Sequence, residues 1–330
     1  MKIALVTGIN GFIGSNLAER LLKDGWKVRG LVRKTSDLKF LEGMNIEYYY
    51  GDITEPKSLV EPMTGAHQVF HVAALSSDWG PFEKFYKINV EGTMNVARAA
   101  HAAGVERMVY VSTVAMYGFG RQNVKESDER LHTNFPYCET KKIAEEQVFE
   151  FARQSGLRIA AVKPGNVFGP KDHTFIEKYC DALIAGKAGY IDGGARKTCP
   201  VYVGNLVDGI MLVSEKEEAI GETFFITDGL DITWKEFTDK ISIELGIKPT
   251  KSSFPYFLAF AVAVIMEFIY TAFDSKNPPL LTPYRIYNGG KDYTFSIEKA
   301  RTILGYEPKV SFDEALQKTV FWYKNRKLVK

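Results

Sequence analysis

A tyrosine and a lysine four positions apart, Tyr137 and Lys141, lie in the helical pattern of residues 136–155. Residues at i and i+4 of a helix share one face and lie a turn apart. An ammonium beside a phenol favours the phenolate and lowers the pKa of the phenol from about 10 toward neutrality. A tyrosine tuned in this way can give or take the proton of an alcohol, so the pair predicts acid–base chemistry on a hydroxyl or carbonyl.

The spacing Tyr-x-x-x-Lys is a weak signal alone, because it recurs at Tyr287–Lys291 and Tyr323–Lys327. The second copy encloses two glycines, which are poor helix formers, and the third lies in a charged C-terminal tail. Only the first copy follows a strand-like run that ends in hydroxyls, Ser112 and Thr113. A hydroxyl there can hydrogen-bond the reacting oxygen, and either residue is a candidate for this role.

Three glycines, Gly8, Gly11 and Gly14, separate the first apolar run from a helical run. Glycines at such a junction let the backbone turn tightly and approach a pyrophosphate, while the helix N-terminus offers free N–H groups to the phosphates. The loop therefore predicts a dinucleotide site. The residues we expect to contact the cofactor there are Gly8, Asn10, Gly11, Phe12, Ile13 and Gly14.

The end of the second predicted strand carries cations and no acid. A carboxylate at this point binds the ribose 2′-OH of NAD, whereas arginine accommodates the 2′-phosphate of NADP. Arg33 and Lys34 stand there in this chain. The sequence therefore favours NADP, with NAD as the alternative.

Alternating strand and helix patterns must position these residues. Apolar runs predict strands at residues 3–7, 28–32, 46–50, 69–73, 108–112 and 159–163, with helices at 14–24, 82–103 and 136–155. Such alternation predicts an α/β fold with a doubly wound parallel sheet. We expect a dinucleotide-binding Rossmann domain at 1–170 and a smaller mixed α/β substrate lobe at 171–330, which returns in part to the first domain near 201–214.

Composition excludes several classes of protein. A formal net charge of +2 over 330 residues gives no basic surface of the kind that binds nucleic acid. Three scattered cysteines and five histidines without ligand spacing indicate neither disulfides nor a metal site, which favours the cytoplasm.

One segment, residues 255–273, is conspicuously apolar, and Glu267 is its only charge. The uninterrupted apolar run is short for a spanning helix. Three interpretations stay open: a buried core or dimer helix, a lid over a lipophilic substrate, and a peripheral membrane contact.

The loop Thr-Gly-x-x-Gly-x-x-Gly at residues 7–14 resembles that of the extended short-chain dehydrogenase/reductase (epimerase/dehydratase) superfamily. The resemblance implies that Tyr137 is the acid/base and that Lys141 tunes it and holds ribose. It favours Thr113 over Ser112, because Thr113 stands four residues before a Tyr-Gly pair. It also implies cofactor contacts at Asp52, Ile53, Ala73, Ala74, Pro164 and Val167. Lys163 departs from the usual arginine, and Asn89 matches a proton-relay asparagine.

The segments at residues 28–33 and 202–208 resemble the branch of 3-beta-hydroxysteroid dehydrogenases and dihydroflavonol reductases. This implies hydride transfer between NADP(H) and a hydroxyl or ketone of a hydrophobic, steroid-, keto acid- or flavonoid-like small molecule, by a homodimer. Val114 and Ala115 replace the acidic pair of sugar dehydratases. Nucleotide-sugar epimerisation with bound NAD is the alternative, and a non-catalytic NADP sensor is a further one.

Overall fold

The computed structural model describes residues 2–326, so Lys327 of the third Tyr-x-x-x-Lys copy lies outside the described residues. Seven parallel strands form the main sheet in the order β12-β7-β5-β4-β1-β2-β3. Their bounds are β1 (Ile3–Thr7), β2 (Lys27–Val32), β3 (Ile46–Tyr50), β4 (Gln68–His71), β5 (Arg107–Val111), β7 (Ile159–Pro164) and β12 (Thr223–Ile226). The predicted doubly wound parallel sheet is confirmed.

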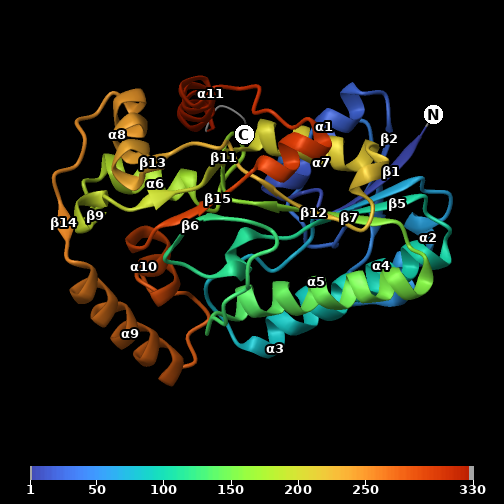
Figure 1. Ribbon diagram of the computed structural model, residues 1–330, viewed down its shortest axis with the longest axis horizontal. Helices are drawn as coiled ribbons and strands as arrows, with labels where there is room; N and C mark the ends of the chain where they lie inside the picture. Colours follow the sequence, from blue (N-terminus) through green and yellow to red (C-terminus); the bar gives the residue numbers. More distant parts are fainter. Residues whose placement is uncertain (1, 327–330) are drawn as a thin grey trace.

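Helices cover both faces of this sheet (Figure 1). One face packs against α1 (Phe12–Lys23) and α7 (Val203–Glu215), and the other against α2 (Val60–Met63), α4 (Gly92–Ala102) and α5 (Pro136–Ser155). The strands bury both faces, and every residue of β4, β5 and β7 is buried. This explains their continuous apolar runs, since a parallel sheet between helices has no solvent face.

The predicted helix at 82–103 is divided in the structure. It consists of α3 (Phe82–Phe85), a π-helical segment at Tyr86–Glu91, and α4. A π-helix adds a residue to the turn and is found frequently at functional sites. Here it contains Asn89, which is fully buried.

The remaining elements form the smaller lobe and its connections. Four two-stranded sheets pair β6 (Arg121–Val124) with β15 (Tyr293–Phe295), β8 (Asn166–Phe168) with β11 (Pro200–Tyr202), β9 (Tyr190–Ile191) with β14 (Ser253–Phe254), and β10 (Lys197–Thr198) with β13 (Ile232–Thr233). The helices are α6 (Ile176–Ile184), α8 (Trp234–Leu245), α9 (Tyr256–Ala272), α10 (Pro283–Gly290) and α11 (Phe312–Asn325). α7 and β12 belong to the main sheet layer, while the expected division of the chain at residue 170 stays a prediction.

The apolar segment at 255–273 is the helix α9, at the outer corner of the smaller lobe (Figure 1). Its contacts run through small residues: Ala259 and Ala263 pack against Ile286 of α10. Among residues 2–326, no helix combines the length and apolar character that crossing a membrane would require.

Candidate active site

The carboxyl ends of the parallel strands bring the expected functional residues to one edge of the sheet. β1 ends at Thr7 before the glycine loop, β4 ends before Ala73, and β5 ends before Ser112 and Thr113. Ligands of open parallel sheets bind at this edge. The fold therefore assembles at one place segments that are more than 100 residues apart in the chain.

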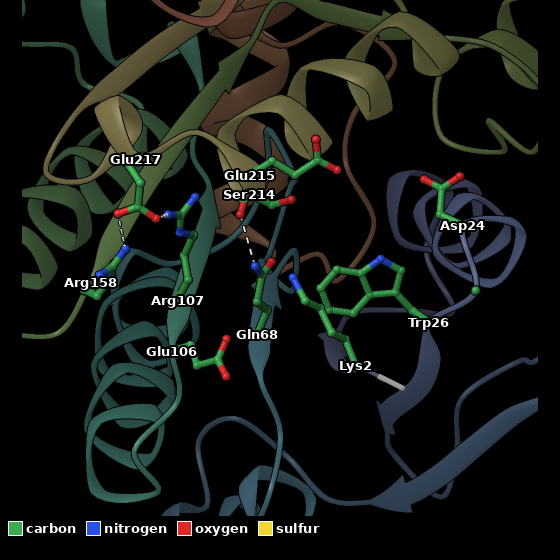
Figure 2. Close-up of a pocket in the computed structure, with 11 residues that line it drawn as sticks. Lys2, Asp24, Trp26, Gln68, Glu106, Arg107, Arg158, Ser214, Glu215 and Glu217 are labelled. Atoms are coloured by element: carbon green, nitrogen blue, oxygen red, sulfur yellow. Dashed lines mark hydrogen bonds and ion pairs between the residues drawn. The ribbon is translucent and has the colours of Figure 1, made fainter.

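A cavity of about 810 Å³ lies at the opposite edge, where the strands begin (Figure 2). Its lining includes Lys2, Gln68, Arg107 and Arg158, which stand at the amino ends of β1, β4, β5 and β7. Glu217 spans its rim and pairs with Arg107 at 2.6 Å. This cavity is thus separated from Tyr137 by the sheet itself.

The glycine loop has the geometry of a phosphate cradle. Gly8 adopts φ +70°, and a Cβ there would lie 2.7 Å from the backbone of Ala73. A Cβ on Gly14 would lie 2.2 Å from the carbonyl oxygen of Gly8. α1 begins at Phe12, and no side chain caps its N-terminus. The first backbone N–H groups of the helix therefore face the loop without a side-chain partner. The loop and helix therefore fit a dinucleotide pyrophosphate.

A buried histidine ties this loop to its neighbours. His71 Nδ1 lies 2.7 Å from Thr7 Oγ1, and His71 Nε2 lies 3.0 Å from Thr93 Oγ1 of α4. Burial lowers the pKa of His71 to about 3, so the ring is neutral. The Thr7 hydroxyl also accepts from the N–H of Ala73 at 3.3 Å. His71 thus holds together the two strand ends between which the cofactor is expected.

The adenosine side of the expected site has a free cationic edge. Arg33 and Lys34 are exposed, and neither side chain has an ion-pair partner among residues 2–326. Asp52 accepts the N–H and hydroxyl of Thr54 at 2.9 Å each, and Ile53 is buried. The Asp52 turn is therefore fixed in place beside the end of β2, to which β3 pairs.

Tyr137 meets two hydroxyls from different segments. Burial raises the pKa of the Tyr137 phenol, and the nearby Thr113 and Ser76 hydroxyls lower it by less. Thr113 is 7% exposed and also accepts the N–H of Ala115 at 3.1 Å, which orients its side chain. Ser76, in the loop after β4, had no signal in the sequence beyond its place near a strand end.

Lys141 is not among the groups that shift the pKa of the Tyr137 phenol, so the expected lowering of that pKa is not found. Its Nζ donates to the carbonyl of Val111 at 2.9 Å and lies 4.2 Å from the centre of the Tyr110 ring. Burial lowers the pKa of Lys141 to about 7. The pKa of Tyr137 is therefore raised in this structure, because burial acts on it without a compensating ammonium.

Ser112 is committed to a buried ionic network, which leaves Thr113 as the hydroxyl near Tyr137. Ser112 donates to Glu145 Oε2 at 2.6 Å. The other oxygen of Glu145 accepts Lys163 at 2.8 Å and Arg130 at 2.6 Å. Lys163 also donates to the Tyr117 hydroxyl at 3.0 Å. The departure at Lys163 thus provides a buried cation that joins β7 to α5. No sequence pattern indicated that Glu145 would be its partner.

Asn89 uses its whole side chain to position neighbours. Its Oδ1 accepts the N–H of Leu75 at 2.7 Å, and its Nδ2 donates to the carbonyl of Leu75 and to the hydroxyl of Thr140. Asn89 therefore links the loop of Ala73 and Ala74 to the helix that carries Tyr137 and Lys141. Its role as a proton relay stays a prediction.

The smaller lobe adds an aromatic wall. Phe135 packs edge-on against Tyr284 at 5.3 Å and Tyr287 at 5.5 Å, both on α10. The Tyr137 phenol packs against the same cluster. Phe135 is about 150 residues from Tyr284 and Tyr287 in the chain, so no local sequence pattern predicts that they meet.

The expected nicotinamide contacts are Pro164 and Val167. Pro164 is the last residue of β7, and Val167 lies in β8. Between them in the sequence, Asn166 exchanges amide hydrogen bonds with Asn288 of α10 at 3.1 and 3.2 Å. This amide pair fixes the smaller lobe against the carboxyl edge of the sheet.

Residues 4–226 match the NAD dependent epimerase/dehydratase family. This chain belongs to that family. It is 30% identical over 314 residues to 4-hydroxy-2-methyl-3-oxo-4-farnesyl-3,4-dihydroquinoline-1-oxide ketoreductase of Stigmatella aurantiaca, covering 94% of this chain and 93% of the relative. It is 31% identical over 337 residues to 3 beta-hydroxysteroid dehydrogenase/Delta 5-->4-isomerase of Mycobacterium tuberculosis, covering 97% and 90%.

Among solved structures, dTDP-glucose 4,6-dehydratase from Streptomyces venezuelae, with NAD and TYD bound, superposes with a TM-score of 0.80. The two chains are 26% identical and cover 99% and 100% of each other. Membership of the epimerase/dehydratase family and the names of the relatives support NAD(P)-dependent oxidoreductase chemistry.

The buried network predicts a large cost for removing Glu145. Glu145→Ala leaves the Lys163 ammonium buried without its carboxylate, so the free energy of unfolding in urea should fall by about 3–5 kcal/mol. Glu146→Ala removes the neighbouring, exposed carboxylate and should cost about 1 kcal/mol or less. The pair Glu145→Gln with Lys163→Met removes both charges and should recover part of the loss. Equal effects of the two alanine variants would contradict the network's role.

The buried Lys141 predicts a pH dependence of stability. Its pKa is about 7 in the fold and 10.5 ordinarily, so between these values the unfolded chain binds more protons and stability rises with pH. Lys141→Met removes this linkage. Any stability advantage of the variant over wild type should therefore shrink as pH rises from 7 toward 10, in urea titrations of the cofactor-free proteins. A difference that stays constant with pH would show that Lys141 is fully charged in the fold.

Proposed function

We propose that this protein catalyses reversible hydride transfer between NADP(H) and a hydroxyl or ketone of a hydrophobic small molecule. The observation that carries the proposal is that the Tyr137 phenol lies near the Thr113 and Ser76 hydroxyls, at the carboxyl edge of the sheet. A phenol and a second hydroxyl converging on one point are what the oxygen of a carbonyl needs as it becomes an alkoxide.

Each residue has a distinct task in this reaction. When bound, the nicotinamide supplies the hydride or accepts it. The Thr113 hydroxyl donates a hydrogen bond to the substrate oxygen and orients it. Tyr137 gives its proton to that oxygen in reduction and takes it back in oxidation. Lys141 would hold the nicotinamide ribose. Its ammonium would have to turn from the Val111 carbonyl toward the phenol to stabilise the phenolate form of Tyr137.

The cationic end of β2 supports NADP as the cofactor. Arg33 and Lys34 are exposed at the end of β2, and β2 itself has no carboxylate that could bind a free 2′-hydroxyl. A 2′-phosphate would pair with both cations without displacing an existing ion pair. NAD is the alternative, because the similar solved structure holds NAD.

Three observations support a hydrophobic substrate. Val114 and Ala115, both buried, follow Thr113 and can move no protons, which disfavours sugar dehydration. Phe135, Tyr284 and Tyr287 offer aromatic surface beside Tyr137. The two curated relatives are named for a farnesylated quinoline oxide and a steroid, which are also largely apolar.

Nucleotide-sugar epimerisation is the second candidate, favoured by the fold shared with a nucleotide-sugar dehydratase. An epimerase would retain NAD through purification, and a uridine nucleotide would raise its Tm at micromolar concentration. A reductase should instead oxidise NADPH in a screen of steroid ketones, β-keto acids and flavonoids. These two measurements separate the candidates.

Removing the phenol hydroxyl should abolish turnover. Tyr137→Phe should lower kcat by about a hundredfold to ten-thousandfold, since a positioned acid/base contributes this much. The Kd for NADPH should stay within about threefold, measured by fluorescence quenching. Tyr323→Phe removes a hydroxyl from α11 that donates to Asp181, so it serves as the control and should keep kcat near wild type. Unchanged turnover in Tyr137→Phe would refute the assignment.

Replacing the cations after β2 should change cofactor preference. In the double variant Arg33→Gln with Lys34→Gln, the KM for NADPH should rise at least about tenfold, because charge-assisted bonds to the 2′-phosphate are lost. The KM for NADH should change little. Lys57→Gln, at a cation outside the glycine loop, is the control. A wild-type enzyme with a clear preference for NADH would overturn the assignment of Arg33.

A further inference from the structure

The outward face of α9 is unusually apolar for a helix in contact with water. Phe257, Ile265 and Phe268 are 68%, 58% and 74% exposed, and of the 17 residues in the helix only Ala259 and Ala263 are buried. Every exposed position from 257 to 273 is uncharged. A contiguous apolar surface of this kind marks a place where the protein meets another phase or molecule.

The orientation of α9 is fixed from its inner side. Ala259 and Ala263 bring the helix close against Ile286 of α10. At the far end, Trp79 donates from its indole to the carbonyl of Ser275 at 2.9 Å, and its ring meets Tyr270 edge-on. Because both ends are held, the large apolar side chains cannot turn inward to cover themselves.

The apolar surface extends past the helix on both sides. Phe254 in β14, Phe273 just after the helix and Leu280 before α10 are 57%, 82% and 77% exposed. Glu267, the only acid within α9, is half-buried and lies on the side that faces Asp78. The surface made by residues 254–273 and Leu280 is called the α9 surface below.

Unpaired lysines flank the α9 surface at both ends. Lys248 and Lys251 precede it and Lys276 follows it; all three are exposed, and none has an ion-pair partner among residues 2–326. Asp274, two residues before Lys276, is an exposed acid at the C-terminal end of the helix. An apolar face between basic ends is complementary to a bilayer, because the acyl region accepts the aromatics and anionic headgroups accept the lysines.

We propose that the α9 surface docks onto a membrane that contains anionic lipid. The helix lies in the plane of the interface, with Phe257, Ile265 and Phe268 directed into the acyl boundary. Trp79 belongs to the same loop as Ser76, which contacts Tyr137, so docking would bring a bilayer close to that loop. Delivery of a hydrophobic substrate from the bilayer rests on the proposed function, whereas docking itself does not.

A second copy of this chain is a poorer occupant of the surface. A parallel pairing of α9 with its copy brings lysine against lysine at both ends. An antiparallel pairing sets Lys251 against both Asp274 and Lys276, so attraction and repulsion offset each other. Like charges facing each other across an interface oppose association. Anionic headgroups would instead neutralise the lysines that lie nearest to the helix in the chain, Lys251 and Lys276.

Vesicle sedimentation of the full-length protein tests docking without reference to catalysis. Vesicles of phosphatidylcholine with phosphatidylserine should sediment the wild-type protein, and vesicles of phosphatidylcholine alone should sediment less of it. The triple variant Phe257→Ser, Phe268→Ser and Phe273→Ser should lower the bound fraction at least about tenfold on both. The variant Lys248→Gln, Lys251→Gln and Lys276→Gln should lose about tenfold on anionic vesicles alone.

Phe321→Ser is the matched control, because this phenylalanine on α11 is 71% exposed and lies outside the α9 surface. It should sediment like wild type, and all variants should keep the wild-type Tm because the replaced side chains are exposed. Equal sedimentation of wild type and the triple phenylalanine variant would overturn the proposal. The proposal would also be overturned if the wild-type protein were a dimer that does not bind vesicles and the triple phenylalanine variant were a monomer. NADPH oxidation is assayed separately, so loss of docking and loss of the proposed activity can be told apart.

Discussion

The carboxylate of Glu145 is the constraint on which the site depends. It lies inside the protein, where a charge without partners is costly, and it takes Lys163, Arg130 and the hydroxyl of Ser112 as partners. These contacts join α5 to the ends of β5 and β7. Since α5 carries Tyr137 and the end of β5 carries Thr113, the network sets the distance between the two groups that would act on the substrate oxygen.

A second set of contacts holds the expected cofactor side. His71, neutral in its buried place, joins the ends of β1 and β4 to α4, and Asn89 joins the loop after β4 to α5. The glycine loop then closes against Ala73 with no room for a Cβ at Gly8. Buried hydrogen bonds from polar residues thus hold the glycine loop, Thr113 and Tyr137 in one arrangement before any ligand binds.

Local patterns carried much of the prediction. Strands buried on both faces appear in the sequence as continuous apolar runs, so the parallel sheet was correctly predicted. The glycine loop lies between the first strand and the first helix, as predicted. The spacing of Tyr137 and Lys141 also predicted that they share a helix face, but it did not predict which groups their side chains contact. Lys141 turns to the carbonyl of Val111 and the ring of Tyr110, and these partners come from another element. Likewise α9 was visible as an apolar segment, while its exposure was not.

The amino-acid sequence by itself determined the family, the order of strands and helices, and the residue types able to bind phosphate and move a proton. These follow from local spacing, because hydrophobic period and glycine position act within a few residues. Only the tertiary structure decided that Ser112 serves Glu145 while Thr113 serves Tyr137, and that α9 faces outward. The physical reason is that burial and partner choice depend on segments that are distant in sequence and meet only in the fold.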